Sequence, residues 1–236
     1  GWNLVAMLLH PVLPDERGRA IGRAGIAHAY RGFWAAASMC GVMRVDASCL
    51  DALRDEPGLI LIANHPTMLD ALLMVAHLPR SACIMKASLM RNVFLGAGAR
   101  LARYIRNDSA WTMVRLAVED LRRGGQLVIF PEGTRTTAPL LGRFLPGVTL
   151  ISKVSKAPIQ TVFIETDTRY LSKGWPIWRV PALPLVFRLR LGERFAAPQD
   201  SARLLAELES YFRHSMEQRP PEAPAECQMP RAHTSS

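Results

Sequence analysis

Short apolar runs of strand-forming composition recur along this chain, and segments with helical periodicity separate them. The runs occupy 59–63, 126–130 and 158–164, with 183–191 as a fourth candidate. Apolar residues recur at helical spacing in 69–77, 114–121, 148–155 and 204–216. Strands joined through helical crossovers run in the same direction. The pattern therefore predicts an α/β fold with a mostly parallel central sheet flanked by helices.

The length of the chain limits how many domains this sheet can belong to. With 236 residues and 49% hydrophobic composition, the chain can bury the core of one α/β domain. We assign 46–218 to that domain and 1–45 to an N-terminal helical segment. The last stretch, 219–236, is rich in Pro and polar residues and has too little apolar surface to fold, so we expect a disordered tail.

The N-terminal segment combines apolar, aromatic and basic residues. Pro11 and Pro14 divide it into two helical stretches, and the second carries arginines among large apolar side chains. This mixture suits a helix that lies in the headgroup region of an anionic membrane. A pair of helices packed on the domain would show the same pattern, and the sequence favours neither interpretation over the other.

The visible sequence contains no apolar stretch of membrane-spanning length. The longest one, 33–43, is far shorter than the roughly 20 residues that cross a bilayer. We therefore expect a peripheral or monotopic protein on the inner face of the cytoplasmic membrane. Because the chain begins at Gly1 without Met, the sequence leaves an upstream segment open.

The net charge is +9, from 29 Lys and Arg against 20 Asp and Glu. A basic chain favours anionic partners, here a phospholipid surface, a phosphorylated substrate or an acyl carrier protein. The basic residues are scattered without a zinc finger or an RNA-binding aromatic motif, so we expect no nucleic acid partner. The four cysteines lack CxxC spacing and a nearby His cluster, which argues against a metal site and a disulfide framework.

The first strand run ends in a polar cluster that contains His65 and Asp70. In parallel α/β sheets, ligands bind at the carboxyl ends of strands. A loop-to-helix turn lets Asp70 accept a hydrogen bond from one imidazole nitrogen of His65, which leaves the other nitrogen as a general base. An acceptor hydroxyl can then attack a thioester directly, and the chain has no GxSxG elbow that would indicate a covalent intermediate.

The second cluster follows the run at 126–130 and has the sequence Pro-Glu-Gly-Thr-Arg. Arg135 can bind a phosphate through two N–H groups, while Gly133 lets backbone N–H groups come close to it. If His65 and Asp70 were absent, a surface turn with an ion pair would be the better explanation of the cluster.

Together these residues resemble the glycerolipid acyltransferase family, whose bacterial members include 1-acylglycerol-3-phosphate acyltransferases. The stretch 64–70 matches the family's NHxxxxD block, and 130–135 matches its FPEGTR block, in the same order and at a similar interval. The resemblance implies that His65 is the catalytic base and Asp70 its partner. It also implies an acceptor-phosphate site that includes Glu132, Gly133, Thr134 and Arg135.

Two further blocks of the family match less closely. The family has an Arg at the end of an apolar segment between the main blocks, and Arg106 is its counterpart, with Lys86 upstream as another basic contact. Thr161 stands where a second Pro is common in the family's late strand. These departures leave the chemistry unchanged and concern the identity of the acceptor.

The resemblance implies transfer of a fatty acyl group to a lysophospholipid hydroxyl in phospholipid biosynthesis, with 1-acylglycerol-3-phosphate as the first candidate. The donor is acyl-CoA or acyl carrier protein, so no cofactor is expected. The same chemistry on an amino-acid lipid, a glycolipid precursor or a secondary-metabolite hydroxyl stays open. A non-catalytic membrane-binding module conflicts with the intact His65 and Asp70. Metal-dependent hydrolysis lacks the additional ligands that a metal needs.

Overall fold

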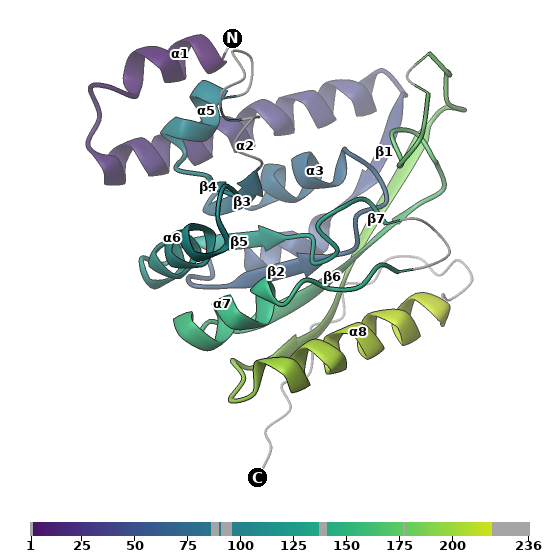
Figure 1. Ribbon diagram of the computed structural model, residues 1–236. Coiled ribbons are helices and arrows are strands. Elements are labelled where there is room, and N and C mark those ends of the chain that lie inside the picture. The colour runs from purple at the N-terminus through teal and green to yellow at the C-terminus, as the bar shows by residue number, and fades with distance from the viewer. Residues whose placement is uncertain (1, 86–89, 91–95, 137–140, 177, 219–236) are drawn as a thin grey trace.

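Among the residues described, seven strands form one sheet with helices on both faces (Figure 1). The structure, a computed structural model, describes residues 2–85, 90, 96–136, 141–176 and 178–218. The elements in chain order are α1 (Trp2–Leu9), α2 (Asp15–Met39), β1 (Met43–Asp46), the 3₁₀ helix η1 (Ser48–Leu53), β2 (Ile60–Ala63), α3 (Asp70–His77), β3 (Ser81–Met85), α5 (Gly96–Leu101), β4 (Ile105–Arg106), α6 (Ala110–Arg122), β5 (Gln126–Ile129), α7 (Gly147–Ser155), β6 (Ile159–Thr166), β7 (Leu185–Phe195) and α8 (Ser201–Glu217). The predicted tail at 219–236 lies outside the described residues.

The strand order across the sheet is β1-β7-β6-β2-β5-β3-β4. Among the described strands, five neighbouring pairs are parallel, and β7 is antiparallel to β6. The described part of the β6–β7 connection contains no helix, so the chain returns in the opposite direction. Every residue of β2 and β5 is buried, as is typical of parallel strands covered on both faces. The mostly parallel α/β fold predicted from the sequence is confirmed.

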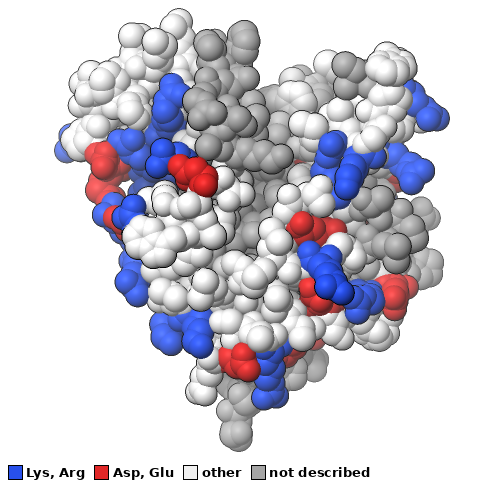
Figure 2. All heavy atoms as spheres, viewed as in Figure 1, with Lys and Arg blue, Asp and Glu red and all other residues white. Residues whose placement is uncertain are grey.

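Two helical layers cover the sheet. The helices α2 and α3 pack together on one face with α1 and α5, while α6, α7 and α8 pack along the other (Figure 1). Buried residues from the strands and from both layers form one main hydrophobic core. On the face seen in Figure 2, basic side chains are spread among acidic ones and do not form a single patch.

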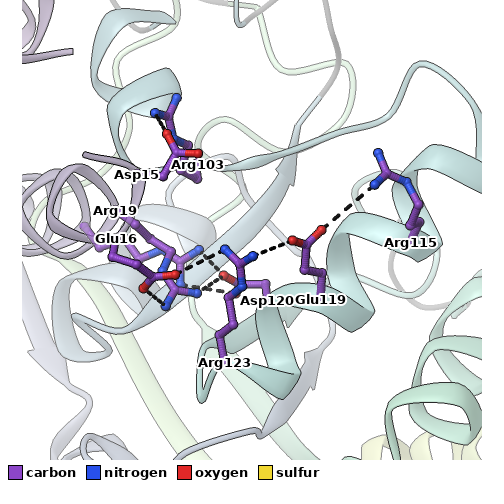
Figure 3. Close-up of polar contacts among 9 residues, drawn as sticks. Asp15, Glu16, Arg19, Arg103, Arg115, Glu119, Asp120 and Arg123 are labelled. Atoms are coloured by element: carbon purple, nitrogen blue, oxygen red, sulfur yellow. Dashed lines mark hydrogen bonds and ion pairs between the residues drawn. The ribbon is translucent and has the colours of Figure 1, made fainter. Parts of the chain in front are cut away.

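A buried ion pair holds helix α2 on the domain. Only 3% of the surface of Arg23 is exposed, and its guanidinium donates to both carboxylate oxygens of Asp120 on α6, at 2.7 and 3.1 Å. The same side chain donates to the backbone carbonyls of Arg80 and Ala102. Figure 3 shows Arg19 reaching the Asp120 carboxylate as well. The charge of Asp120 is therefore compensated by two residues that lie one helical turn apart on α2.

The rest of the 1–45 segment also packs closely. Helix α1 contacts α5, and α2 contacts both α3 and α5. A Cβ atom at Gly22 would lie 2.4 Å from the backbone nitrogen of Ala102, so only glycine permits this approach of the two backbones. Helix α2 ends at Met39, and the boundary placed at residue 45 falls inside strand β1. Within the described ranges, no helix combines the length and the apolar character needed to cross a membrane.

The sequence pattern does not predict three of the strands, β1, β3 and β4. β1 has the sequence Met-Arg-Val-Asp, β3 contains a single β-branched residue, and β4 has two residues, so none of them carries a strong strand pattern. They become strands through pairing with neighbours, since β1 lies along β7, and β3 along β5. Tertiary context therefore decides their conformation.

The Arg23–Asp120 pair yields a test of stability. Replacing Arg23 with Ala leaves the Asp120 carboxylate buried with less compensating charge, which we expect to lower the free energy of unfolding by about 3–5 kcal/mol. Arg115→Ala removes an exposed pair with Glu119 on the same helix and serves as the control, with an expected loss of about 0–1 kcal/mol. Denaturant unfolding of both variants measures the difference. Equal losses would show that the buried pair does not hold α2 in place.

Candidate active site

The loop that follows β2 is fixed to the neighbouring strand β6. Asn64 is buried, and its side-chain amide donates to the carbonyl oxygen of Ile164 at 2.9 Å. The side-chain oxygen Oδ1 of Asn64 in turn accepts from the backbone N–H of Ile164 at 2.8 Å. This two-way contact continues the β2–β6 pairing beyond the end of β2. His65, the next residue, therefore leaves the sheet from a fixed point.

His65 and Asp70 form the hydrogen bond that the sequence predicts. The Nδ1 atom of His65 lies 2.9 Å from Oδ2 of Asp70, the first residue of α3. Thr67 donates to the same carboxylate through its backbone N–H and through its hydroxyl, both at 2.8 Å. An ionised carboxylate only accepts hydrogen bonds, so Nδ1 carries the proton and Nε2 keeps a free electron pair. The imidazole is thus held in the tautomer that a general base requires.

The carboxylate of Asp70 is fully buried. Burial raises the pKa of Asp70 above its usual value, while the hydrogen bonds from His65 and Thr67 and the charge of His65 act in the opposite direction. A negative charge on Asp70 is stabilised when the neighbouring imidazole takes up a proton and becomes positively charged. The pair is therefore suited to stabilising an imidazolium during a proton transfer.

Phe130 sets the plane of the imidazole ring. It directly follows β5, which pairs in parallel with β2, so its side chain lies beside the end of β2. The rings of Phe130 and His65 are stacked, with centroids 4.0 Å apart and an angle of 19° between the planes. With Nδ1 held by Asp70 and one face covered by Phe130, the direction of Nε2 is fixed.

Thr136 joins the two polar loops. Its hydroxyl accepts the backbone N–H of His65 at 2.8 Å, and its own N–H donates to the His65 carbonyl at 2.7 Å. The Thr136 hydroxyl donates to Oε1 of the buried Glu132, whose Oε2 accepts from the N–H of Gly142 at 2.7 Å. Both oxygens of the Glu132 carboxylate are therefore used to hold the loop that supports His65.

The remaining residues of the second cluster have different surroundings. Gly133 has a φ of +65°, and a Cβ atom there would lie 2.7 Å from a side-chain carbon of Leu145, so the turn requires glycine. Thr134 is exposed. Arg135 is half-buried, and its Nη1 donates to the carbonyl oxygens of Leu171 and Ser172 at 2.8 and 3.0 Å. A guanidinium has five N–H donors, so these contacts do not exhaust its capacity.

Arg106 is not brought beside His65. Arg106 ends β4 and is exposed, with its Nε 3.5 Å from the carboxylate of Asp108. Two strands separate β4 from β2, which corresponds to about 14 Å across the sheet. Lys86 lies outside the described residues. Of the predicted site residues, the structure thus brings together His65, Asp70 and the loop that contains Glu132 and Gly133.

A large cavity opens beside His65. Its volume is about 1330 Å³, which exceeds the roughly 300–1,000 Å³ typical of pockets for small ligands. His65, Phe130 and Gly133 line it at the polar loops, and side chains such as Ile26 and Val148 line it farther away. No group of three or more His, Cys, Asp or Glu side chains able to hold a metal ion occurs within the described ranges. The site thus combines a proton acceptor with space for a long apolar group.

Comparison with known proteins identifies the family. The family model described as Acyltransferase matches residues 44–165, just over half of the chain, and this stretch includes both polar loops. The chain belongs to this acyltransferase family. It is therefore an acyltransferase, and the predicted resemblance to the glycerolipid acyltransferase family is confirmed.

Two relatives show how far this likeness extends. The 1-acyl-sn-glycerol-3-phosphate acyltransferase of Pseudomonas aeruginosa is 22% identical over 214 residues, which cover 88% of this chain and 79% of the relative. The crystal structure of the 1-acyl-sn-glycerophosphate (LPA) acyltransferase PlsC from Thermotoga maritima superimposes with a TM-score of 0.68 and 19% identity. That match covers 92% of this chain and 89% of PlsC. The acyltransferase thus shares the fold of PlsC along nearly its whole length.

Four residues of the site are not predicted from the sequence. They position His65 and its partners, and they are Asn64, Thr67, Phe130 and Thr136. All four lie within the two polar blocks or directly after one of them, which is the signal that could have found them. The partners of Asn64, Phe130 and Thr136 belong to other strands or loops, so spacing along the chain does not show what they contact, whereas Thr67 bonds Asp70 within its own block.

The contact between the two loops of this acyltransferase can be tested at Thr136. In Thr136→Val the backbone N–H of His65 and the Glu132 carboxylate lose their partner, at a cost of about 1–3 kcal/mol. We expect kcat to fall roughly 10-fold or more with a smaller change in KM, because the base moves while the binding surfaces stay. Thr136→Ser keeps the hydroxyl and should retain most of the activity. Equal kcat for Thr136→Val and wild type would show that the loop contact does not position His65.

Proposed function

We propose that this acyltransferase moves a fatty acyl group from acyl-CoA or acyl carrier protein to the hydroxyl of a lysophospholipid, with 1-acylglycerol-3-phosphate as the acceptor. The observation that carries the proposal is the His65–Asp70 pair at the wall of a large apolar cavity. The activity named for the Pseudomonas aeruginosa relative supports the same acceptor.

In the proposed reaction, Nε2 of His65 takes the proton of the acceptor hydroxyl while its oxygen attacks the thioester carbonyl. A C–O bond forms and the C–S bond breaks, and the proton held by His65 passes to the departing thiolate. Asp70 stabilises the imidazolium between these two proton transfers. Neither step requires a covalent acyl-enzyme or a cofactor.

The acyl chain of the donor is proposed to occupy the cavity. The lining beyond His65 consists mainly of apolar side chains, including Ile26, Val75, Met113 and Ile151. Each CH₂ group that moves from water into such surroundings contributes about 0.8 kcal/mol. A long chain is thereby retained while its thioester stays at the polar loops next to His65.

For the acceptor phosphate, Arg135 is the proposed ligand, with Arg106 or Lys86 assisting. The contacts of Arg135 with Leu171 and Ser172 favour a second candidate, in which Arg135 holds that loop and the acceptor is a lipid alcohol without phosphate. An amino-acid lipid, a glycolipid precursor and a secondary-metabolite hydroxyl belong to that class. The chemistry at His65 is the same in both cases.

Both acceptor classes are lipids, so we propose that the enzyme works on an anionic membrane surface, at the inner face of the cytoplasmic membrane. The first helix supports this, because it exposes large apolar side chains to solvent. They are Leu4, Val5, Met7 and Leu8, followed by Val12. Apolar side chains exposed in this manner mark membrane or protein interaction sites.

A direct test offers the purified protein a panel of lyso-lipids with acyl-CoA and with acyl carrier protein, and identifies the products by mass. His65→Ala should reduce transfer about 100-fold to 10,000-fold while the protein stays folded, because it removes the general base. Asp70→Asn should reduce it to a similar extent. His77→Ala, at a partly exposed histidine that also contacts an aspartate, is the control and should keep its activity. Wild-type turnover by folded His65→Ala would contradict the mechanism.

The two acceptor classes differ in their response to Arg135. If Arg135 binds the phosphate, Arg135→Ala should lower kcat/KM roughly 10-fold to 100-fold on the phosphorylated acceptor, since a charged hydrogen bond contributes about 1.5–3 kcal/mol. On a matched acceptor without phosphate the change should be small. Arg135→Lys should recover part of the loss, because it keeps the charge without the planar fork. Equal losses on both acceptors would assign Arg135 to the support of the loop.

A further inference from the structure

The connection between β6 and β7, of which residues 167–176 and 178–184 are described, exposes large apolar side chains. Trp178 is 83% exposed, Val180 is 82% exposed and Leu183 is 54% exposed. Large apolar side chains are normally buried in a folded protein, and a cluster of exposed ones marks an interaction site. This connection, which lies at the upper right of Figure 1 beyond the ends of β6 and β7, is therefore a candidate docking surface.

After Asp167, all charged side chains of this connection are positive. Residues 168–184 contain Arg169, Lys173 and Arg179 and no Asp or Glu. The guanidinium of Arg179 lies over the ring of Trp175, 5.0 Å from the ring centroid, and Trp175 Nε1 donates to the Arg179 carbonyl. Trp side chains concentrate at the interface between lipid and water, and Lys and Arg near that surface are attracted to anionic headgroups.

The connection lies at the same edge of the sheet as the proposed active site. β6 and β2 are parallel neighbours, so the chain leaves both at their carboxyl ends on that edge. The carbonyl oxygen of Leu171 accepts the backbone N–H of Met68, which belongs to the loop between His65 and Asp70, at 3.3 Å. It also accepts from Nη1 of Arg135. A partner that binds the connection therefore contacts a segment that is hydrogen-bonded to both polar loops.

The end of the connection lies close to the end of α2. The N–H of Leu185 donates to the carbonyl oxygen of Val42 at 2.9 Å, which brings the end of the connection beside the turn after α2. Met39, the last residue of α2, is 88% exposed. The N-terminal segment and the β6–β7 connection, two parts of the chain that are far apart in sequence, thus meet here, and each exposes large apolar side chains.

We propose that the β6–β7 connection is a second lipid-docking element, separate from the N-terminal helices, which holds the active-site edge against an anionic membrane surface. This inference rests on the proposed function in one respect, namely that the acceptor is a lipid held in a membrane. Trp178, Val180 and Leu183 are each more than half exposed, whereas the side chains that anchor protein partners sit in packed pockets. Protruding Trp and Val with surrounding cations fit a lipid surface better than an acidic protein.

The test measures binding to vesicles of phosphatidylcholine alone and of phosphatidylcholine mixed with phosphatidylglycerol. We expect Trp178→Ala to bind both kinds about 10-fold more weakly, because it removes a large apolar side chain from the interface. Arg179→Gln should bind the mixed vesicles about 5-fold more weakly and leave binding to neutral vesicles unchanged. Trp111→Ala, at a tryptophan on α6 that is 74% exposed and lies under Arg115, is the matched control and should bind as wild type.

Activity measurements separate this proposal from the proposed function. Trp178→Ala should lose activity on an acceptor embedded in vesicles and keep it on a short-chain acceptor and donor dissolved in water. Inactivity of the wild type on every lyso-lipid would contradict the proposed function and leave the vesicle results valid. Equal vesicle binding by Trp178→Ala, Trp111→Ala and wild type would overturn the docking element. A loss seen only with acyl carrier protein as donor, with vesicle binding unchanged, would assign the surface to a protein partner.

Discussion

The hydrogen bonds between the two polar loops are the interaction on which the rest of the site depends. β2 and β5 are parallel neighbours, so the loops that follow them start side by side. Thr136 then bonds the His65 backbone in both directions, and Glu132 holds Thr136 from behind. Loops are normally the mobile part of an α/β fold, and these contacts give His65 the fixed geometry that proton transfer requires.

Two buried carboxylates have opposite roles in this fold. Asp120 is compensated by Arg23 and Arg19, so its charge is paired permanently and joins α2 to α6. Asp70 faces a histidine and the donors of Thr67, so part of its compensation appears only when His65 takes up a proton. A buried charge with a permanent partner stabilises structure, whereas one with a titratable partner is suited to chemistry.

The cavity of the site and an exposed apolar surface share one helical layer. The cavity extends from the polar loops towards the helical layer of α1, α2 and α5, and residues of α1 line its far part. The same helix α1 carries apolar side chains that face solvent. The layer that covers the cavity is therefore also a surface suited to lipid, which fits the proposed transfer of a fatty acyl group to a lipid acceptor.

The sequence by itself determined the α/β class, the main buried strands and the His65–Asp70 pair, because strand and helix periodicity and a five-residue spacing are local properties. It did not determine β1, β3 and β4, which are strands only beside their neighbours, or the antiparallel return of β7. Tertiary structure alone decided that Thr136 and Glu132 support His65, and that Arg135 contacts Leu171, because those partners are far apart in the chain. Such contacts depend on which strands become neighbours, and strand order is a property of the whole sheet.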